Sequence, residues 1–166
     1  PYPRILVAAN ADIGIQRAAT IADGWLVSTR ATYPTIEGQA RLYKQALSDT
    51  GAAGGIWAWR EAYVAQSRDE AMRIIRPSVE AMYADRAAFG HARDLPATDR
   101  IDVPFDQLLE NRFIIGDPDE CEREIRRYEA IGVETIIMRM QWPGMTQEQA
   151  FDSIRMMGSE VLPRFK

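Results

Sequence analysis

Cysteine and histidine are scarce in this chain: its 166 residues include one of each, Cys121 and His91. One cysteine cannot form an internal disulfide, and one cysteine with one histidine cannot supply the ligand cluster of a zinc site. We therefore expect no metal site and a reducing, cytoplasmic location. Basic residues are outnumbered as well, 20 against 24 acidic ones. Without a basic excess to displace counterions, we expect no nucleic-acid partner.

Long apolar runs are also missing. No run approaches the ~20 residues that a membrane span needs, and the first residues, PYPR, lack the apolar core and cleavage site of a signal peptide. We expect a soluble protein without a membrane partner. What is present is ordinary globular composition, 46% apolar and 27% charged, in a chain long enough for one domain with a sizeable core.

Four short segments are rich in Val, Ile, Leu or Trp and are apolar on both faces, which is typical of parallel strands covered on both sides. They are ILVAA (5–9), GWLVS (24–28), IWAWREAYVA (56–65) and ETIIMRM (134–140). Helical patterns lie between them, and in the third of these Pro77 is expected to kink or break the helix. The alternation of strand and helix predicts right-handed βαβ units and therefore an α/β fold with a parallel sheet.

Two helix starts are marked by capping boxes. In GDPDECEREIRRY, Asp117 is the expected N-cap and Glu120 its partner, and Thr146 with Gln149 repeats the pattern before the last helix. Cys121 falls on the apolar face of the first of these helices, so we expect it in the core.

Residues 91–113 interrupt the helical and strand patterns, with Pro96, Pro104 and several aspartates. We interpret this stretch as an irregular excursion, either a loop or a functional segment, within a single partial domain that spans residues 1–166.

The residues that directly follow the predicted strands are the candidates for a site, because ligands of parallel α/β folds gather at the carboxyl ends of strands. The turn AANADIG after the first strand has small side chains that let backbone N–H groups approach an anion. It is either a phosphate site or an ordinary turn in which Asn10 or Asp12 caps the next helix. Ser28, Thr29 and Arg30 follow the second strand and allow the same two interpretations.

The third strand carries Trp57 and Trp59 on one face and Arg60 on the other, by strand alternation. Because charges inside a fold are normally paired, Arg60 beside Glu61 is interpreted as a structural ion pair.

The fourth strand contains an arginine among apolar residues. Alternation places Arg139 on the same face as Gln141. A buried arginine needs an anion, which is either a ligand's phosphate or carboxylate or a carboxylate of the core. Trp142 either lines a pocket or closes the turn that follows.

Catalytic residues remain unassigned. His91 lies in a polar stretch with no second histidine, serine or cysteine arranged around it, and no acid/base pair, nucleophile motif or metal motif is visible. If the protein is an enzyme, a bound cofactor is expected to supply the chemistry.

Four segments, in this order, resemble the C-terminal half of the luciferase-like monooxygenase family. They are ILVAANADIGIQRAATIADGWL, REAYVAQSRDEA, FIIGDPDECEREIRRYEAIGVETIIMRM and PGMTQEQAFDSIRMMGSEVLPRF. Members of that family are TIM-barrel oxidoreductases that use a flavin or a deazaflavin. The resemblance implies half of a (β/α)8 barrel, its strands 5 to 8 in sequential order. It also implies an oxidoreductase or monooxygenase that uses FMN or coenzyme F420 on a small-molecule substrate.

The same resemblance implies roles for particular residues. The cofactor-binding residues would be Ala9, Asn10, Ala11, Gly14, Ser28 and Thr29. Asn10 and Ala11 stand where the family commonly carries serines in its phosphate-binding turn. The substrate-binding residues would be Arg139, Gln141 and Trp142.

Half a barrel leaves sheet edges and an inner strand face uncovered, so a partner is expected, either a second copy in a homo-oligomer such as a dimer or a missing N-terminal half. An alternative function is a non-catalytic half-barrel subunit that assembles with a second copy or another chain. A further alternative is a small doubly wound domain that binds a phosphorylated ligand. Strand order separates these folds, because a doubly wound sheet reverses its order and a barrel does not.

Overall fold

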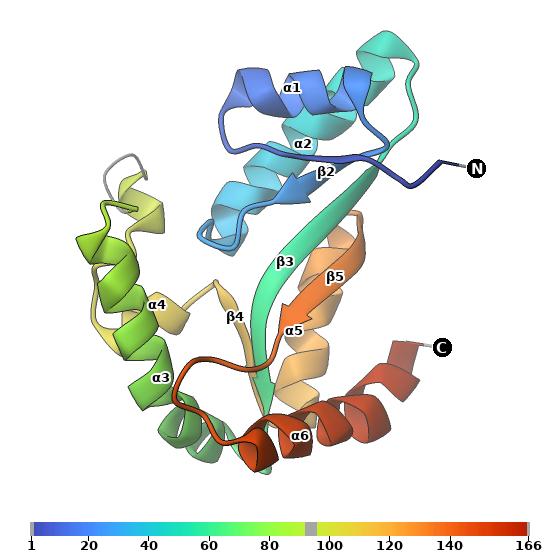
Figure 1. Ribbon diagram of the computed structural model, residues 1–166. Helices are drawn as coiled ribbons and strands as arrows, with labels where there is room; N and C mark the ends of the chain where they lie inside the picture. Colours follow the sequence, from blue (N-terminus) through green and yellow to red (C-terminus); the bar gives the residue numbers. More distant parts are fainter. Residues whose placement is uncertain (1, 92–95, 166) are drawn as a thin grey trace.

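A computed structural model describes residues 2–91 and 96–165 of the chain. Within them, five strands form one parallel sheet (Figure 1). The strands are β1 (Leu6–Ala8), β2 (Gly24–Val27), β3 (Gly55–Val64), β4 (Phe113–Gly116) and β5 (Val133–Arg139). The α-helices are α1 (Asp12–Ile21), α2 (Tyr33–Thr50), α3 (Arg68–Ala88), α4 (Phe105–Leu109), α5 (Pro118–Ala130) and α6 (Gln147–Met156). A π-helical turn, Met157–Val161, and a 3-10 turn, Leu162–Phe165, continue from α6.

The order of the predicted strands in the sheet is sequential. β1 pairs with β2 and β2 with β3, and both β2 and β5 pair with residues 56–58 of β3, so they occupy its opposite edges. The spatial order β1, β2, β3, β5 therefore follows the chain order without a reversal. This order is consistent with part of a TIM barrel, and the doubly wound alternative is wrong.

β4 was not predicted as a strand. Its four residues are all buried, and Phe113 pairs with Glu61, which also pairs with Arg139 of β5. β4 therefore lies along the edge of β3 opposite β5, beyond the end of β2. A four-residue apolar segment has too little pattern to distinguish a strand from a loop, so this element came from tertiary pairing.

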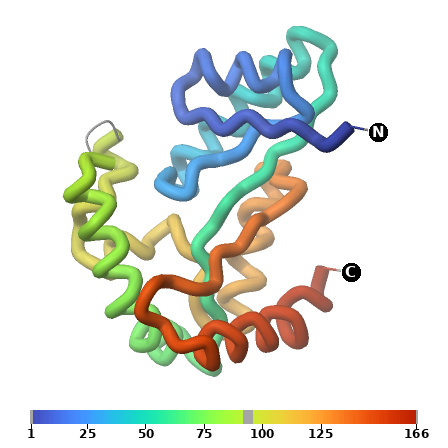
Figure 2. Tube along the Cα trace, viewed as in Figure 1, coloured from blue at the N-terminus to red at the C-terminus, as the bar shows by residue number. Residues whose placement is uncertain are grey.

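The predicted excursion, residues 91–113, is partly regular. It contains the 3-10 turn Ala97–Asp99 and α4, and its residues 92–95 lie outside the described residues. Figure 2 shows α3 running back from the far end of β3 toward the loop that follows β2. The excursion therefore begins near the carboxyl ends of β1 and β2 and not at the end of β3.

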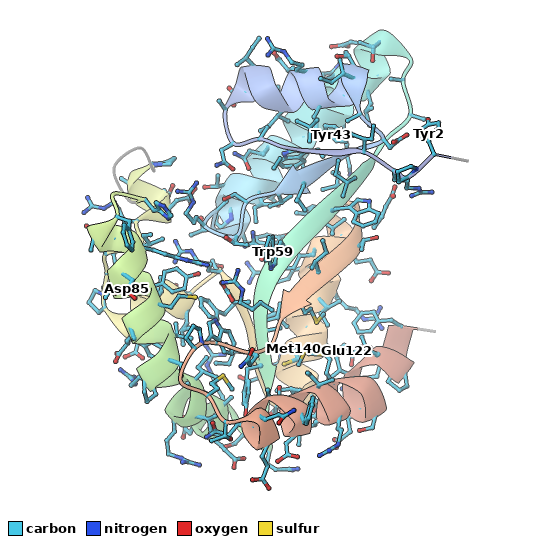
Figure 3. The ribbon with its side chains drawn as sticks, viewed as in Figure 1. Tyr2, Tyr43, Trp59, Asp85, Glu122 and Met140 are labelled. Atoms are coloured by element: carbon cyan, nitrogen blue, oxygen red, sulfur yellow. The ribbon has the colours of Figure 1, made fainter. Side chains whose placement is uncertain are left out.

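The two faces of β3 belong to different hydrophobic clusters. Ala58 and Ala62 pack with α1, α2 and α5, whereas Tyr63 packs with α3, α4 and Trp142. Toward the start of β3, the face that carries Tyr63 is uncovered: Trp59, labelled beside β3 in Figure 3, is 36% exposed and its β5 partner Ile137 is 39% exposed. This uncovered surface is the inner face of the partial barrel.

Local signals had mixed outcomes. Both capping boxes are present, Asp117 with Glu120 and Thr146 with Gln149, and Cys121 is fully buried, as predicted. Of the kink or break expected at Pro77, the break is wrong, because α3 continues through it. Pro77 and Arg73, whose carbonyl loses its helical partner there, are both exposed, so water can satisfy that carbonyl.

The predicted cap of the first helix is also wrong. Ala11 is the N-cap of α1 and makes no side-chain hydrogen bond to the helix, while Asp12 is already the first helical residue. No side chain therefore neutralises the positive end of the helix dipole from the N-cap position.

Candidate functional site

A cavity of about 470 Å³ lies at the carboxyl ends of β1 and β2. We call it the β1–β2 cavity. Its lining comes from the turn after β1, the loop after β2, the start of α2 and the chain that follows α3. The lining residues are Asn10, Ala11, Ser28, Arg30, Ala31, Thr35, Gln39, Gly90, His91, Pro96 and Asp99. Three residues predicted from separate strand ends, Asn10, Ala11 and Ser28, are thus brought together.

The other predicted cofactor residues do not line this cavity. Ala9 accepts a hydrogen bond through its carbonyl from Trp25 Nε1 at 2.9 Å. A Cβ at Gly14 would lie 3.0 Å from the Ala9 Cβ, so Gly14 permits the close approach of the helix to the turn. Ala9 and Gly14 therefore shape the turn, and Thr29 is a partly buried member of the loop outside the lining.

Asp99, from the excursion, fixes the start of α2. Its carboxylate is 2% exposed and accepts hydrogen bonds from the Thr32 amide (3.0 Å), the Thr32 hydroxyl (2.7 Å) and the Thr35 hydroxyl (2.9 Å). On the same side, the Arg30 guanidinium donates to the His91 carbonyl at 2.9 Å, which joins the loop after β2 to the end of α3. Sequence reasoning missed Asp99, because nothing in its spacing separates it from the other aspartates of the excursion.

Two buried arginines lie behind the loop that follows β2. Arg60 is fully buried and donates to the carbonyls of Ser28 and Ala31, the latter at 2.9 Å. Arg112 is 1% exposed and donates to the Arg30 carbonyl at 2.9 Å. The expected Arg60–Glu61 ion pair is wrong, because adjacent strand residues point to opposite faces. The hydrogen-bond partners of Arg60 and Arg112 are backbone carbonyls.

Glu61 is the centre of a second polar cluster, on the inner face of β3. It is fully buried, accepts a hydrogen bond from Trp142 Nε1 at 3.0 Å and pairs with Arg139 at 3.3 Å and Arg86 at 3.6 Å. Burial raises the pKa of the Glu61 carboxyl, while the guanidiniums of Arg139 and Arg86 act in the opposite direction. The anion that Arg139 requires is therefore a carboxylate of the core.

The structure places the three predicted substrate residues in different surroundings. Trp142 is fully buried and stacks on Phe113, with ring centroids 6.4 Å apart, so it closes the turn after β5 instead of lining a pocket. Gln141 is exposed and lines neither the β1–β2 cavity nor the cavity beside α6. Arg139 stays partly exposed on the inner face, 5.2 Å from the Trp59 ring centroid. Trp59 is a residue that sequence reasoning placed on the correct face without assigning it to a site.

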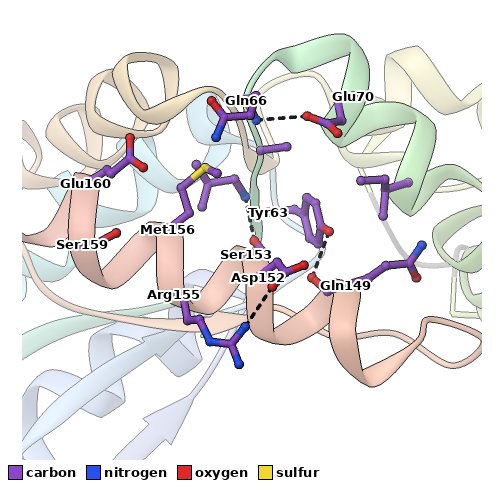
Figure 4. A pocket seen from close by; sticks show the side chains of 13 residues that line it. Tyr63, Gln66, Glu70, Gln149, Asp152, Ser153, Arg155, Met156, Ser159 and Glu160 are labelled. Carbon is purple, nitrogen blue, oxygen red and sulfur yellow. Dashed lines mark hydrogen bonds and ion pairs between the residues drawn. The ribbon is translucent and has the colours of Figure 1, made fainter.

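A second cavity, of about 440 Å³, lies between the end of β3, the start of α3, and α6 (Figure 4). Several of its polar groups are paired with one another: Ser153 Oγ accepts from the Val64 amide at 2.9 Å, and the Tyr63 hydroxyl donates to the Gln149 carbonyl at 3.0 Å. None of the predicted site residues lies there. We interpret this cavity as a gap in the packing of α6 against the sheet.

The groups of the β1–β2 cavity fit a phosphate ester. The positive end of α1 lacks a side-chain cap, Arg30 adds a cation, and Ser28 Oγ accepts from the Arg30 amide, which leaves its own proton free to donate. Gln39 Oε1 is buried without a partner among the described residues, while Gln39 Nε2 donates to the Asn10 carbonyl. An unpaired acceptor suits a hydroxyl donor such as those of a sugar-like chain next to a phosphate.

Residues 1–135 match the family model described as luciferase-like monooxygenase. The chain belongs to the luciferase-like monooxygenase family. No match is found among curated proteins. Within the residues described, no helix combines the length and apolar character needed to cross a membrane.

Solved structures of similar fold include FMN- and F420-dependent enzymes. The monooxygenase RslO1 from Streptomyces bottropensis is 23% identical with a TM-score of 0.78, and the match covers 100% of this chain and 49% of that one. The coenzyme F420-dependent tetrahydromethanopterin reductase from Methanopyrus kandleri is 20% identical (TM-score 0.68; 98% and 51% covered). The oxygenating constituent of 3,6-diketocamphane monooxygenase from Pseudomonas putida, in complex with FMN, is 19% identical (TM-score 0.72; 98% and 49% covered).

This luciferase-like chain therefore spans about half the length of the structures that it matches. At these identities the comparison establishes the fold. The chain thus has a known family, the fold of a parallel partial barrel, and a cavity at the carboxyl ends of its first two strands.

Proposed function

We propose that the chain is the C-terminal half of a luciferase-like oxidoreductase and that its β1–β2 cavity binds the phosphate end of FMN or coenzyme F420. The observation that carries the proposal is the convergence of Asn10, Ala11 and Ser28 on one cavity, beside Arg30 and the uncapped N-terminus of α1. The similar structures support it, because one of them is an FMN complex and another an F420-dependent enzyme.

Each side of the site has a separate task in this proposal. When bound, the flavin or deazaflavin supplies the redox chemistry. Ser28, Arg30 and the first amides of α1 bind the phosphate, and Gln39 Oε1 accepts a hydrogen bond from the hydroxylated chain. Trp59 and Ile137, on the inner face, exclude water on the side of the ring, and Arg139 adds a cation there. No residue of this chain is assigned as the catalytic acid or base.

The open inner face supports a second element of the proposal, a complementary half. Trp59 and Ile137 are large, apolar and exposed, and β1 and β5 have no neighbour on their outer edges among the described strands. Such edges and faces are normally covered. The complement is either the N-terminal half of the same protein or a second copy in a homodimer. A non-catalytic subunit with the same surface is the alternative function.

A binding titration tests the cofactor proposal. FMN and F420 are added to the purified protein, and binding is followed by visible absorption and cofactor fluorescence. Asn10→Asp places a negative charge beside the phosphate and is expected to weaken binding about tenfold. Gln16→Glu makes the same amide-to-carboxylate change at an exposed position of α1 outside the cavity and should leave affinity unchanged. Failure of the wild-type protein to bind either cofactor would overturn the proposal and favour the non-catalytic subunit.

The complementary half is tested by the molar mass in solution and by acrylamide quenching of tryptophan fluorescence. Trp59 is far more exposed than the fully buried Trp25 and Trp142. Assembly should therefore reduce quenching in the wild-type protein and have a smaller effect in Trp59→Phe. A monomer whose Trp59 remains fully quenchable in the presence of a complementary half would contradict this part.

A further inference from the structure

Arg60 and Arg112 are two buried cations without a carboxylate partner. Neither takes part in an ion pair among the described residues. Apart from the Tyr128 ring, 5.7 Å from the Arg60 guanidinium, their partners are backbone carbonyls. Burial lowers the pKa of Arg112, in agreement with the cost of keeping its charge away from water. Buried charges are normally paired, so these two require an explanation.

Their hydrogen bonds fix the direction of the peptide groups in the loop after β2. Arg60 takes the carbonyls of Ser28 and Ala31, and Arg112 takes the carbonyl of Arg30. In a planar trans peptide, the N–H points away from the carbonyl. The amides of residues 29, 31 and 32 therefore point away from the two guanidiniums.

Among these three amides, that of Thr32 has a visible hydrogen-bond partner. The Thr32 amide donates to Asp99, a residue that lines the β1–β2 cavity. Ala31 itself lines the cavity, and Thr29 lies between the lining residues Ser28 and Arg30. The arginines thus hold three carbonyls of the loop on the side opposite the amides of residues 29, 31 and 32, and the one of these amides with a visible partner is directed at a lining residue of the cavity.

Positive side chains outnumber negative ones around the loop, which also favours an anion. Three guanidiniums, those of Arg30, Arg60 and Arg112, surround it, against the single buried carboxylate of Asp99. Asp12 is exposed and is not part of the lining, and Glu61 is already paired with arginines on the opposite face of β3. A bound anion would supply the missing negative charge.

We propose that Arg60 and Arg112 are positioning residues for an anion in the β1–β2 cavity: from behind the loop they aim its amides at a phosphate group and provide its buried counter-charge. This inference rests on the proposed function, because it assumes that the cavity takes a phosphate. Both arginines are shielded from solvent and therefore touch no ligand. The inference assigns to them the selectivity for a cofactor that carries a phosphate.

The test compares each cofactor with its phosphate-free form, FMN with riboflavin and F420 with its deazaflavin chromophore, in fluorescence titrations of the isolated protein. Arg112→Lys keeps the charge but loses the planar group that reaches several carbonyls, and Arg112→Met loses both. We expect the preference for the phosphorylated form to fall about fivefold in Arg112→Lys and about thirtyfold in Arg112→Met, with riboflavin affinity unchanged. Arg68→Lys is the matched control, because the Arg68 guanidinium also donates to a carbonyl, that of Ile115, away from the cavity.

The outcomes separate this inference from the proposed function. If the wild-type protein binds neither form of either cofactor, the proposed function fails and the inference with it. If binding is intact but the variants weaken FMN and riboflavin equally, the arginines are merely structural and the inference alone is overturned. If the Arg112 variants do not fold, the wild-type protein still decides: an equal affinity for FMN and riboflavin, or an FMN preference that added salt abolishes, would refute a buried counter-charge, whereas an FMN preference that persists at high salt supports it, because salt screens buried charges much less than exposed ones.

Discussion

Trp142→Phe is expected to destabilise the protein by about 3 kcal/mol. The indole N–H donates to a fully buried carboxylate, Glu61 Oε2, at 3.0 Å, and a hydrogen bond to a charged group contributes about 1.5–3 kcal/mol. Because Arg139 still pairs with Glu61 in the variant, we take about 2 kcal/mol for this bond. The smaller phenyl ring leaves a cavity against Phe113 that costs about 1 kcal/mol more.

The pH dependence of the destabilisation separates the contribution of the hydrogen bond to Glu61 from that of the cavity. The Trp142 N–H favours the ionised form of Glu61, whose pKa burial raises above its ordinary value. A group with a raised pKa adds stability that is fully present below its ordinary pKa and is lost as the pH rises through the raised value. Removing the Trp142 donor raises the pKa further, so the deficit of the variant is largest at a pH above the raised pKa, where Glu61 is ionised, and shrinks as acid protonates Glu61.

Urea unfolding followed by far-ultraviolet circular dichroism measures this difference at neutral and acidic pH. Trp59→Phe is the control, because Trp59 lies partly exposed on the inner face and should cost less than about 1 kcal/mol. A Trp142→Phe loss below about 1 kcal/mol, or one that does not change with pH, would refute the description of Trp142 as the donor to a buried carboxylate.

Three further predictions concern other parts of the fold. Asp99→Ala leaves three donors from Thr32 and Thr35 unpaired and should cost about 3 kcal/mol in urea unfolding, and an unchanged midpoint would contradict the buried role of this carboxylate. Asp117→Ala removes the capping box of α5 and should lower the free energy of unfolding by about 1 kcal/mol, measured the same way. Burial raises the pKa of Cys121 to about 12, so its thiol stays protonated in the native protein and should react with a thiol reagent at pH 8 only after urea is added.

Elements with a strong local signal were predictable from the sequence. The apolar runs of β2, β3 and β5 and the capping boxes before α5 and α6 carry their own structural information, and the structure has each of them. β4 carries too little pattern to be recognised, because it is a strand only where Glu61 and its neighbours in β3 supply a partner. Pro77 does not end α3, because water can satisfy the carbonyl that loses its helical partner at this exposed position.

The candidate site was predictable only in part, because some of its residues are brought there by tertiary structure and carry no local signal. Asn10, Ala11 and Ser28 could be found because parallel strands end at one edge of a sheet. Asp99 and His91 reach the same cavity from the excursion, and no rule of spacing connects a segment so far along the chain with the end of β2. The partners of Arg60 were mistaken because a neighbouring residue in sequence lies on the other face of a strand.

The length of β3 has a consequence for how the protein unfolds. Its ten residues pair with three other strands and contribute side chains to both hydrophobic clusters. The helices α3 and α4 therefore cannot detach as an independent unit without removing the support of the barrel strands. Amide hydrogens in the middle of β3 should exchange with solvent only when the whole chain opens, so the two clusters form one cooperative unit.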